Sequence, residues 1–295
     1  MSPIQESGTG DVQAYLDNID RKTGKTPDDF CALAEKGSSG RQSGNQNKMT
    51  KAALSLSATV DRPAPRPWLF MASRVAAAGP VAVALIIVAL HAIKPEFQPS
   101  WRFISEYAIG PHGWIMKLAF LIWAASCAAL ALTLKHELKS WPGKIGVAVL
   151  LIVAVALVPA GLFAQDPVTA KPHELTTSGN IHAIASMIGI PGIPIAAMLI
   201  SSSLWRTNQA WTPYRRSIMW AAHAAWISLV LMGLYLAWAV PRAGGFNADV
   251  WAGWMNRLVV ATYIAWQFTI AYRLITISKA QDRTSDLRFR KTACK

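Results

Sequence analysis

The chain has 295 residues, of which 53% are hydrophobic and only 15% are charged, and its formal net charge is +13. Soluble domains carry about 25% charged residues, so this composition argues against a soluble enzyme and indicates a membrane protein. The basic residues flank apolar runs instead of forming a basic surface on a soluble fold. We therefore expect the bilayer as partner, with anionic lipid at the cytoplasmic face, and no nucleic acid.

The first part of the chain is polar. Residues 1–48 are predicted to be an appendage that ends in a flexible linker, because residues 37–47 are rich in Gly, Ser and Asn. Residues 12–36, VQAYLDNIDRKTGKTPDDFCALAEK, resemble the opening of the small soluble family called domain of unknown function 4287, as a truncated copy. Residues 49–68 form a juxtamembrane segment, and the first span after it is expected to be an uncleaved signal anchor.

Six long apolar segments follow. Each is close to the roughly 20 residues that a helix needs to cross about 30 Å of hydrocarbon. A closed β-barrel would instead show short alternating strands. The predicted fold class is therefore all-α, a polytopic bundle of six transmembrane helices over residues 69–278 with a basic cytoplasmic tail over residues 279–295. The predicted helices are 69–93, 114–134, 145–164, 181–205, 217–240 and 256–278.

The orientation of these spans is predicted from their basic flanks. Seventeen Lys and Arg residues flank one face of the predicted bundle, and six flank the other. Positive residues collect on the cytoplasmic side, so both termini and the second and fourth connections are expected inside. The protein is then a multi-pass protein of the inner cell membrane.

The fourth span contains an unusual cluster of helix-breaking residues. Pro191, Gly192 and Pro194 fall near its middle. Proline lacks a backbone donor and kinks helices, so this segment is expected to bend or open locally. A packing kink and a hinge beside a binding crevice are both consistent with the pattern.

The connections predicted to lie outside carry the unusual polar residues. The candidate cluster consists of Ser105, Glu106, Asp166, His182 and His91. Ser105 is suited to cap the second helix, with Glu106 at its positive N-terminus, and Asp166 to form a turn or cap. His182 lies inside the fourth helix, where it is expected to hydrogen-bond Asp166 or Glu106.

Two cofactors are weaker alternatives for this cluster. Glu106, Asp166 and His182 together carry the donor types that bind a metal ion. Haem needs two axial ligands at one depth on different helices, and His91 with His182 would meet that requirement. No cofactor is predicted as the main interpretation.

A family resemblance rests on the same residues. Its motifs are Ile104-Ser105-Glu106-Tyr107-Ala108, Gly113-Trp114-Ile115-Met116, Phe163-x-x-Asp166-Pro167 and Gly179-x-x-His182. In this order they resemble the bacterial and archaeal membrane family named domain of unknown function 998, over residues 70–278. The resemblance implies six spans and a polar site, and it implies no reaction.

Three functions stay open at this point. The first is a lipid-interacting, sensory or accessory membrane protein whose outer polar cluster is structural or binds a small ligand. The second is a membrane enzyme that uses Glu106, Asp166 and His182 on a lipid-like substrate. The third is a small-molecule transporter, suggested by the break in the fourth span. The sequence contains no GxSxG elbow, HExxH helix or phosphate loop.

Overall fold

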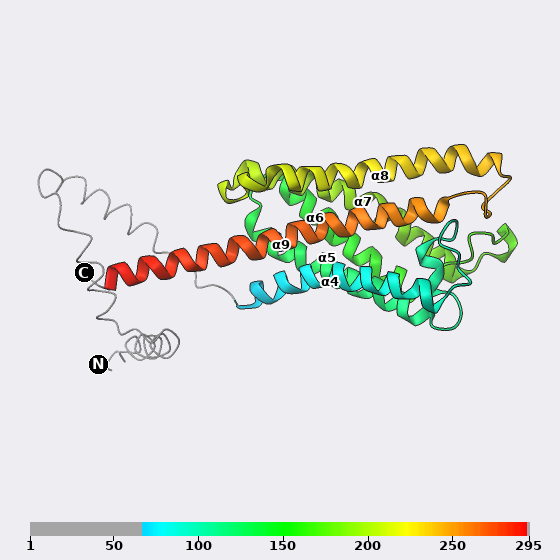
Figure 1. Cartoon of the computed structure of the whole chain (residues 1–295), viewed down its shortest axis with the longest axis horizontal. Helices are drawn as coiled ribbons and strands as arrows, with labels where there is room; N and C mark the ends of the chain where they lie inside the picture. Colours follow the sequence, from blue (N-terminus) through cyan, green and yellow to red (C-terminus); the bar gives the residue numbers. More distant parts are fainter. Residues whose placement is uncertain (1–66, 294–295) are drawn as a thin grey trace, which may run out of the picture. The chain divides into compact units, whose positions relative to one another are not determined.

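A computed structural model describes residues 67–293, with side chains described over residues 68–280 (Figure 1). The described residues form helices and contain no strand, which confirms the all-α prediction. All six long helices have the length and composition to cross a membrane. They are α4 (Pro67–Ile93), α5 (Gly113–Glu137), α6 (Trp141–Leu162), α7 (Thr177–Thr207), α8 (Arg215–Arg242) and α9 (Ala252–Ala293). The expectations for residues 1–48 and 12–36 lie outside the described part of the chain.

Short 3-10 helices interrupt three of the connections. They are η1 (Ile104–Ala108), η2 (Pro172–Glu174) and η3 (Gln209–Tyr214). We call the end of the bundle that carries residues 94–112, 163–176 and 243–251 the loop face. The polar residues singled out from the sequence lie at or near this end.

Polar caps explain why two helices begin earlier than predicted. α6 begins at Trp141 because the Ser140 hydroxyl accepts a hydrogen bond from the Gly143 N–H. α7 begins at Thr177 because the Thr176 hydroxyl accepts from the Gly179 N–H at 3.0 Å. Such caps bond to backbone N–H groups of the first turn that have no partner within the helix. A hydropathy profile contains no information about these bonds.

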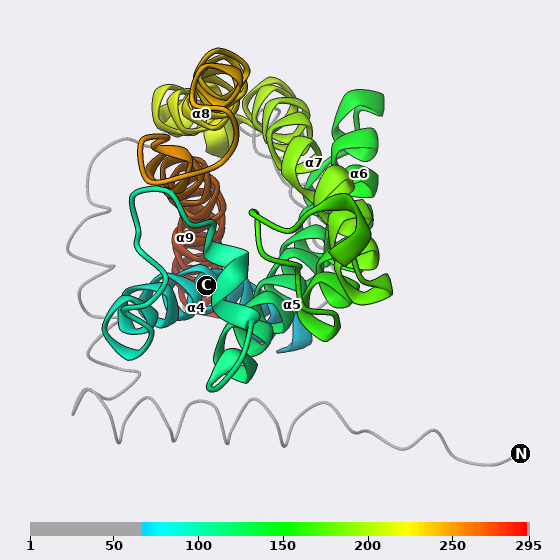
Figure 2. The ribbon, with the colours of Figure 1, turned by 90° about the vertical axis from the view of Figure 1, so that its right-hand side faces the viewer.

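The six helices follow one another around a ring, and α9 closes it between α8 and α4 (Figure 2). Side-chain hydrogen bonds join α9 to four other helices. These bonds link Arg257 to His91, Gln267 to Ser126, Trp266 to Ser201 and Thr262 to Ser228. The last helix is therefore fixed to α4, α5, α7 and α8 by specific polar contacts.

A buried polar network joins α4, α5 and α9. Pro80 has no N–H, so the Ala76 carbonyl one turn earlier lacks its helical donor. The Ser126 hydroxyl donates to that carbonyl at 3.1 Å and accepts from the Gln267 amide at 2.8 Å. The Gln267 oxygen in turn accepts from the Trp123 indole at 2.8 Å. Polar groups in hydrocarbon must be satisfied within the protein, and this network does so.

The Pro/Gly cluster of α7 does not open the helix. α7 is continuous through Pro191, Gly192 and Pro194, so the expected local opening is absent. A Cβ on Gly192 would meet the Val153 side chain of α6 at 2.5 Å. The glycine therefore permits close approach of α6 and α7, as a packing role requires. The hinge stays a prediction.

The neighbouring helix satisfies a backbone group that the second proline frees. Pro194 leaves the Ile190 carbonyl without its helical donor. The Tyr263 hydroxyl of α9 donates to this carbonyl at 2.6 Å. This contact fixes α9 against α7 at the depth where the candidate site lies.

Candidate functional site

His182 lies in the second turn of α7 and is 1% exposed. Its Nδ1 lies 3.0 Å from the carbonyl oxygens of both Ala160 and Phe163, at the C-terminal end of α6. These carbonyls are the ones that a helix end leaves without donors. Since carbonyl oxygens only accept, Nδ1 is the protonated nitrogen of the neutral ring, and Nε2 carries a lone pair.

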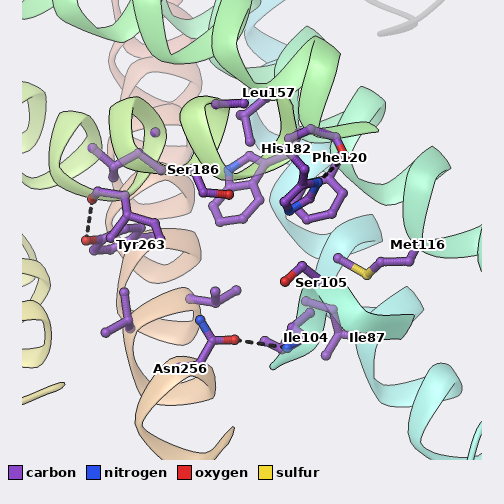
Figure 3. Close-up of a pocket in the computed structure, with 18 residues that line it drawn as sticks. Ile87, Ile104, Ser105, Met116, Phe120, Leu157, His182, Ser186, Asn256 and Tyr263 are labelled. Carbon is purple, nitrogen blue, oxygen red and sulfur yellow. Dashed lines mark hydrogen bonds between the residues drawn. The ribbon is translucent and has the colours of Figure 1, made fainter. Parts of the chain in front are cut away.

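The second ring nitrogen of His182 faces a cavity. Nε2 is buried and has no hydrogen-bond partner among the residues that the structure describes. It borders a cavity of about 80 Å³ at the centre of the bundle (Figure 3). The apolar walls come from five helices and from η1, with the Phe120 ring packed edge-on against the imidazole at 5.5 Å. The apolar lining includes Ile87, Ile104, Met116, Trp123, Leu157 and Ile193.

Neutral polar side chains complete the cavity wall, and within the described part of the chain no charged side chain lines it. Figure 3 shows Ser105, Ser186, Asn256 and Tyr263 around the same space as His182. The Asn256 Oδ1 accepts from the Ile104 N–H at 3.0 Å, which leaves its amide N–H groups for another acceptor. The cavity is thus an apolar space with a few fixed donors and acceptors.

A second pocket lies between this cavity and the loop face. It has a volume of about 480 Å³ and lies between the loop before α7 and helices α7, α8 and α9. Four residues line both spaces, namely Ser105, Ser186, Ile190 and Asn256. These shared residues form a mixed polar and apolar wall between the cavity and the pocket at the loop face.

Glu106 is completely buried, but it does not border the cavity. Its carboxylate accepts from the Phe103 N–H at 2.8 Å and the Val168 N–H at 2.9 Å, and it lies 3.2 Å from the Arg102 guanidinium. Burial raises the pKa of Glu106, although the Val168 N–H and Arg102 favour the ionised form. The residue ties η1 to the connection between α6 and α7.

The predicted capping of the second helix by Ser105 and Glu106 is wrong. Both residues lie within η1, and α5 begins only at Gly113. The residue before α5 is His112, which has a left-handed backbone (φ 60°) and makes no side-chain cap. The Ser105 hydroxyl donates instead to Gln165.

Asp166 is a structural residue of the loop before α7. Its carboxylate accepts from both the N–H and the hydroxyl of Thr176, each at 2.8 Å. A Cβ on Gly179 would overlap this carboxylate, so a glycine is required for the approach. Asp166 therefore holds the residue that caps α7, Thr176, and is not itself the cap that was predicted.

The geometry does not support the cofactor alternatives. Glu106, Asp166 and His182 bond to different partners, and His182 does not bond either acid. Over residues 68–280, no three His, Cys, Asp or Glu side chains are placed to hold a metal ion. In His91 the Nδ1 donates to the Ile87 carbonyl at 2.6 Å, and Nε2 accepts from Arg257 at 2.9 Å. This leaves His91 no nitrogen for haem iron.

The structure thus brings only two of the five predicted residues, Ser105 and His182, to one cavity. Sequence reasoning missed Ser186, Asn256 and Tyr263. Asn256 was detectable as an amide inside the first turns of an apolar segment. Ser186 and Tyr263 carry no comparable signal, because both residue types are common in membrane helices.

Comparison with known proteins gives one match. A family model described as "Protein of unknown function (DUF998)" matches residues 76–273. This match confirms the resemblance drawn from the motifs between Ile104 and His182. The resemblance of residues 12–36 to a second family stays unconfirmed. Neither the curated proteins nor the solved structures gave a match.

Proposed function

This chain belongs to the family described as proteins of unknown function (DUF998), and that description names no activity, so we propose a function from the geometry of the cavity. It is a membrane-embedded binding protein of the cell membrane, a lipid-interacting, sensory or accessory component. Its ligand is a small, uncharged, largely apolar molecule with a hydrogen-bond donor, such as the hydroxyl of a lipid-like alcohol.

The unpartnered Nε2 of His182 carries this proposal. A buried acceptor without a donor costs about 1 to 3 kcal/mol, and a ligand hydroxyl at Nε2 would remove that cost. The two α6 carbonyls hold the ring so that the lone pair stays directed at the cavity. The apolar walls contain no charged side chain, so a charged ligand would enter at a large desolvation cost.

Binding is favoured over catalysis because the groups that activate a histidine for chemistry are missing from the cavity. A general base is commonly oriented by a carboxylate, whereas His182 is oriented by backbone carbonyls. The Ser105 hydroxyl donates to Gln165 and so does not act as a nucleophile hydrogen-bonded to His182. The alternatives of an enzyme and of a transporter have no comparable support.

Two glycines provide a matched test. A Cβ at Gly189, on the cavity wall, and a Cβ at Gly233, in α8, would each meet open space. Both lie inside helices, so replacement by leucine favours the helix in each case. The leucine of Gly189→Leu enters the cavity, and that of Gly233→Leu does not.

The measurement is the thermal shift of the purified full chain with two isomeric probes, 1-hexanol and pentyl methyl ether, of which only the alcohol has an O–H donor. For the wild type and Gly233→Leu, we expect the alcohol to raise the melting temperature more than the ether does. For Gly189→Leu, we expect both probes to raise it equally little. Equal shifts by both probes in the wild type would contradict the proposal, as would an undiminished alcohol response in Gly189→Leu.

A further inference from the structure

A long apolar groove runs between α4 and α9, which lie side by side in Figures 1 and 2. Its volume is about 550 Å³. Much of its lining is exposed, including Leu85, Val88, Trp254 and Phe268. On a membrane-spanning bundle these side chains face lipid. The groove is long enough and apolar enough to bind an acyl chain.

Arg257 lies on this groove near its loop-face end. The guanidinium donates to His91 Nε2 at 2.9 Å, to the Arg102 and Gly253 carbonyls at 2.8 and 3.1 Å, and to the Tyr107 hydroxyl at 3.0 Å. Every one of these acceptors is uncharged. A guanidinium has five N–H donors, so within the described part of the chain one donor is left over.

The charge of Arg257 is not balanced locally. The Glu106 carboxylate attracts the Arg257 guanidinium electrostatically, but its ion pair, at 3.2 Å, is with Arg102. Two guanidiniums therefore share one carboxylate, and a net positive charge remains at the end of the groove. Ionisable groups at the edge of hydrocarbon are costly and are normally paired, so an anion at this position is expected.

We propose that the α4–α9 groove binds an anionic phospholipid. Its phosphate takes the remaining N–H of Arg257, beside the exposed indole of Trp254, and one acyl chain lies along the groove. Arginine suits phosphate because its planar donors match the oxygens. This site is separate from the central cavity. The two spaces share Ile87, Ile104 and Val260 as part of their walls, and the proposal does not depend on what the cavity binds.

The test uses native mass spectrometry of the full chain, incubated in detergent with equal amounts of phosphatidylglycerol and phosphatidylcholine. One unbalanced basic residue favours an anionic lipid on the order of fivefold, which is the preference we expect. Arg257→Gln removes the charge, and Arg242→Gln is its control, since Arg242 is an exposed arginine at the end of α8 that bonds only its own helix.

A second pair of variants separates lipid binding from damage to the Arg257 contacts. Ala265→Trp fills the groove two helical turns away from Arg257, and Ala89→Trp adds the same bulk at an exposed alanine of α4 that does not line the groove. We expect Arg257→Gln and Ala265→Trp to lose the preference and both controls to keep it.

Three results would overturn the proposal. They are no preference in the wild type, loss in Arg257→Gln with full retention in Ala265→Trp, and displacement of the lipid by inorganic phosphate at constant ionic strength. The last result would assign the arginine to a free anion.

Discussion

The hydroxyl of Tyr263 on α9 donates at 2.6 Å to the Ile190 carbonyl on α7, the carbonyl that Pro194 leaves without its helical donor. The Ser126 hydroxyl does the same for the Ala76 carbonyl that Pro80 frees. In both places a neighbouring helix supplies the hydrogen bond that proline removes. The Tyr263 contact also positions the cavity wall opposite His182.

Tyr263→Phe should lower the free energy of unfolding by about 0.5 to 2 kcal/mol, because it leaves a buried carbonyl without a donor. Pro194→Ala supplies an N–H to the same carbonyl. We therefore expect Tyr263→Phe to cost much less in the Pro194→Ala background. Denaturant titration of the four proteins of this double-mutant cycle measures the coupling. Strictly additive effects would contradict the assignment.

The contact of Gly179 with Asp166 predicts a local effect. In Gly179→Ala the new Cβ overlaps the carboxylate, so Asp166 must leave Thr176 and the start of α7 loosens. We expect a loss of about 1 to 3 kcal/mol and faster cleavage after the exposed Glu174 by a glutamyl endopeptidase. Gly233→Ala, where a Cβ meets open space, should leave the cleavage rate unchanged.

The buried carboxyl of Glu106 predicts a pH dependence of stability. Burial raises its pKa above the ordinary value of 4.5, so the folded protein keeps a proton that the unfolded chain has released. The free energy of unfolding should then fall as the pH rises from about 4.5 through the folded-state pKa. Glu106→Gln should abolish this slope. Glu96→Gln, which changes a largely exposed side chain, should retain it, and a slope that persists in Glu106→Gln would refute the prediction.

The orientation of the bundle stays a prediction from the basic residues. Reporter fusions after Glu137 and after Lys171 should be active as cytoplasmic and as external reporters respectively, because positive residues collect inside. The loop face would then be the outer face of the membrane. The opposite pattern would reverse the orientation without affecting the geometry of the cavity.

The sequence was sufficient to predict the fold because membrane helices follow from the length and hydropathy of each segment. The ends of the helices were less accurate, since Ser140 and Thr176 act through single hydrogen bonds that hydropathy does not record. The extent of the last helix was also missed: α9 continues to Ala293, through most of the segment predicted to be a tail.

The candidate site was predicted only in part. The residues were selected because ionisable side chains are unusual in a membrane sequence, whereas the proposed function rests on neutral groups. Glu106 and Asp166 proved to be fully bonded within their loops. His182 was predicted as a member of the polar cluster, but its hydrogen-bond partners are backbone carbonyls, which no side-chain pattern reveals. Gln267, an amide in an otherwise apolar stretch, was a visible signal of the buried network and was overlooked.

The central claim is that His182 presents an unprotonated Nε2 to a ligand donor. Nitrogen NMR of the full chain labelled at histidine tests it most directly, with His182→Gln to assign the signal. We predict the neutral tautomer protonated at Nδ1, with an Nε2 resonance that shifts when 1-hexanol is added and not with pentyl methyl ether. A ring protonated at Nε2, or an Nε2 resonance that responds to neither probe, would contradict the account.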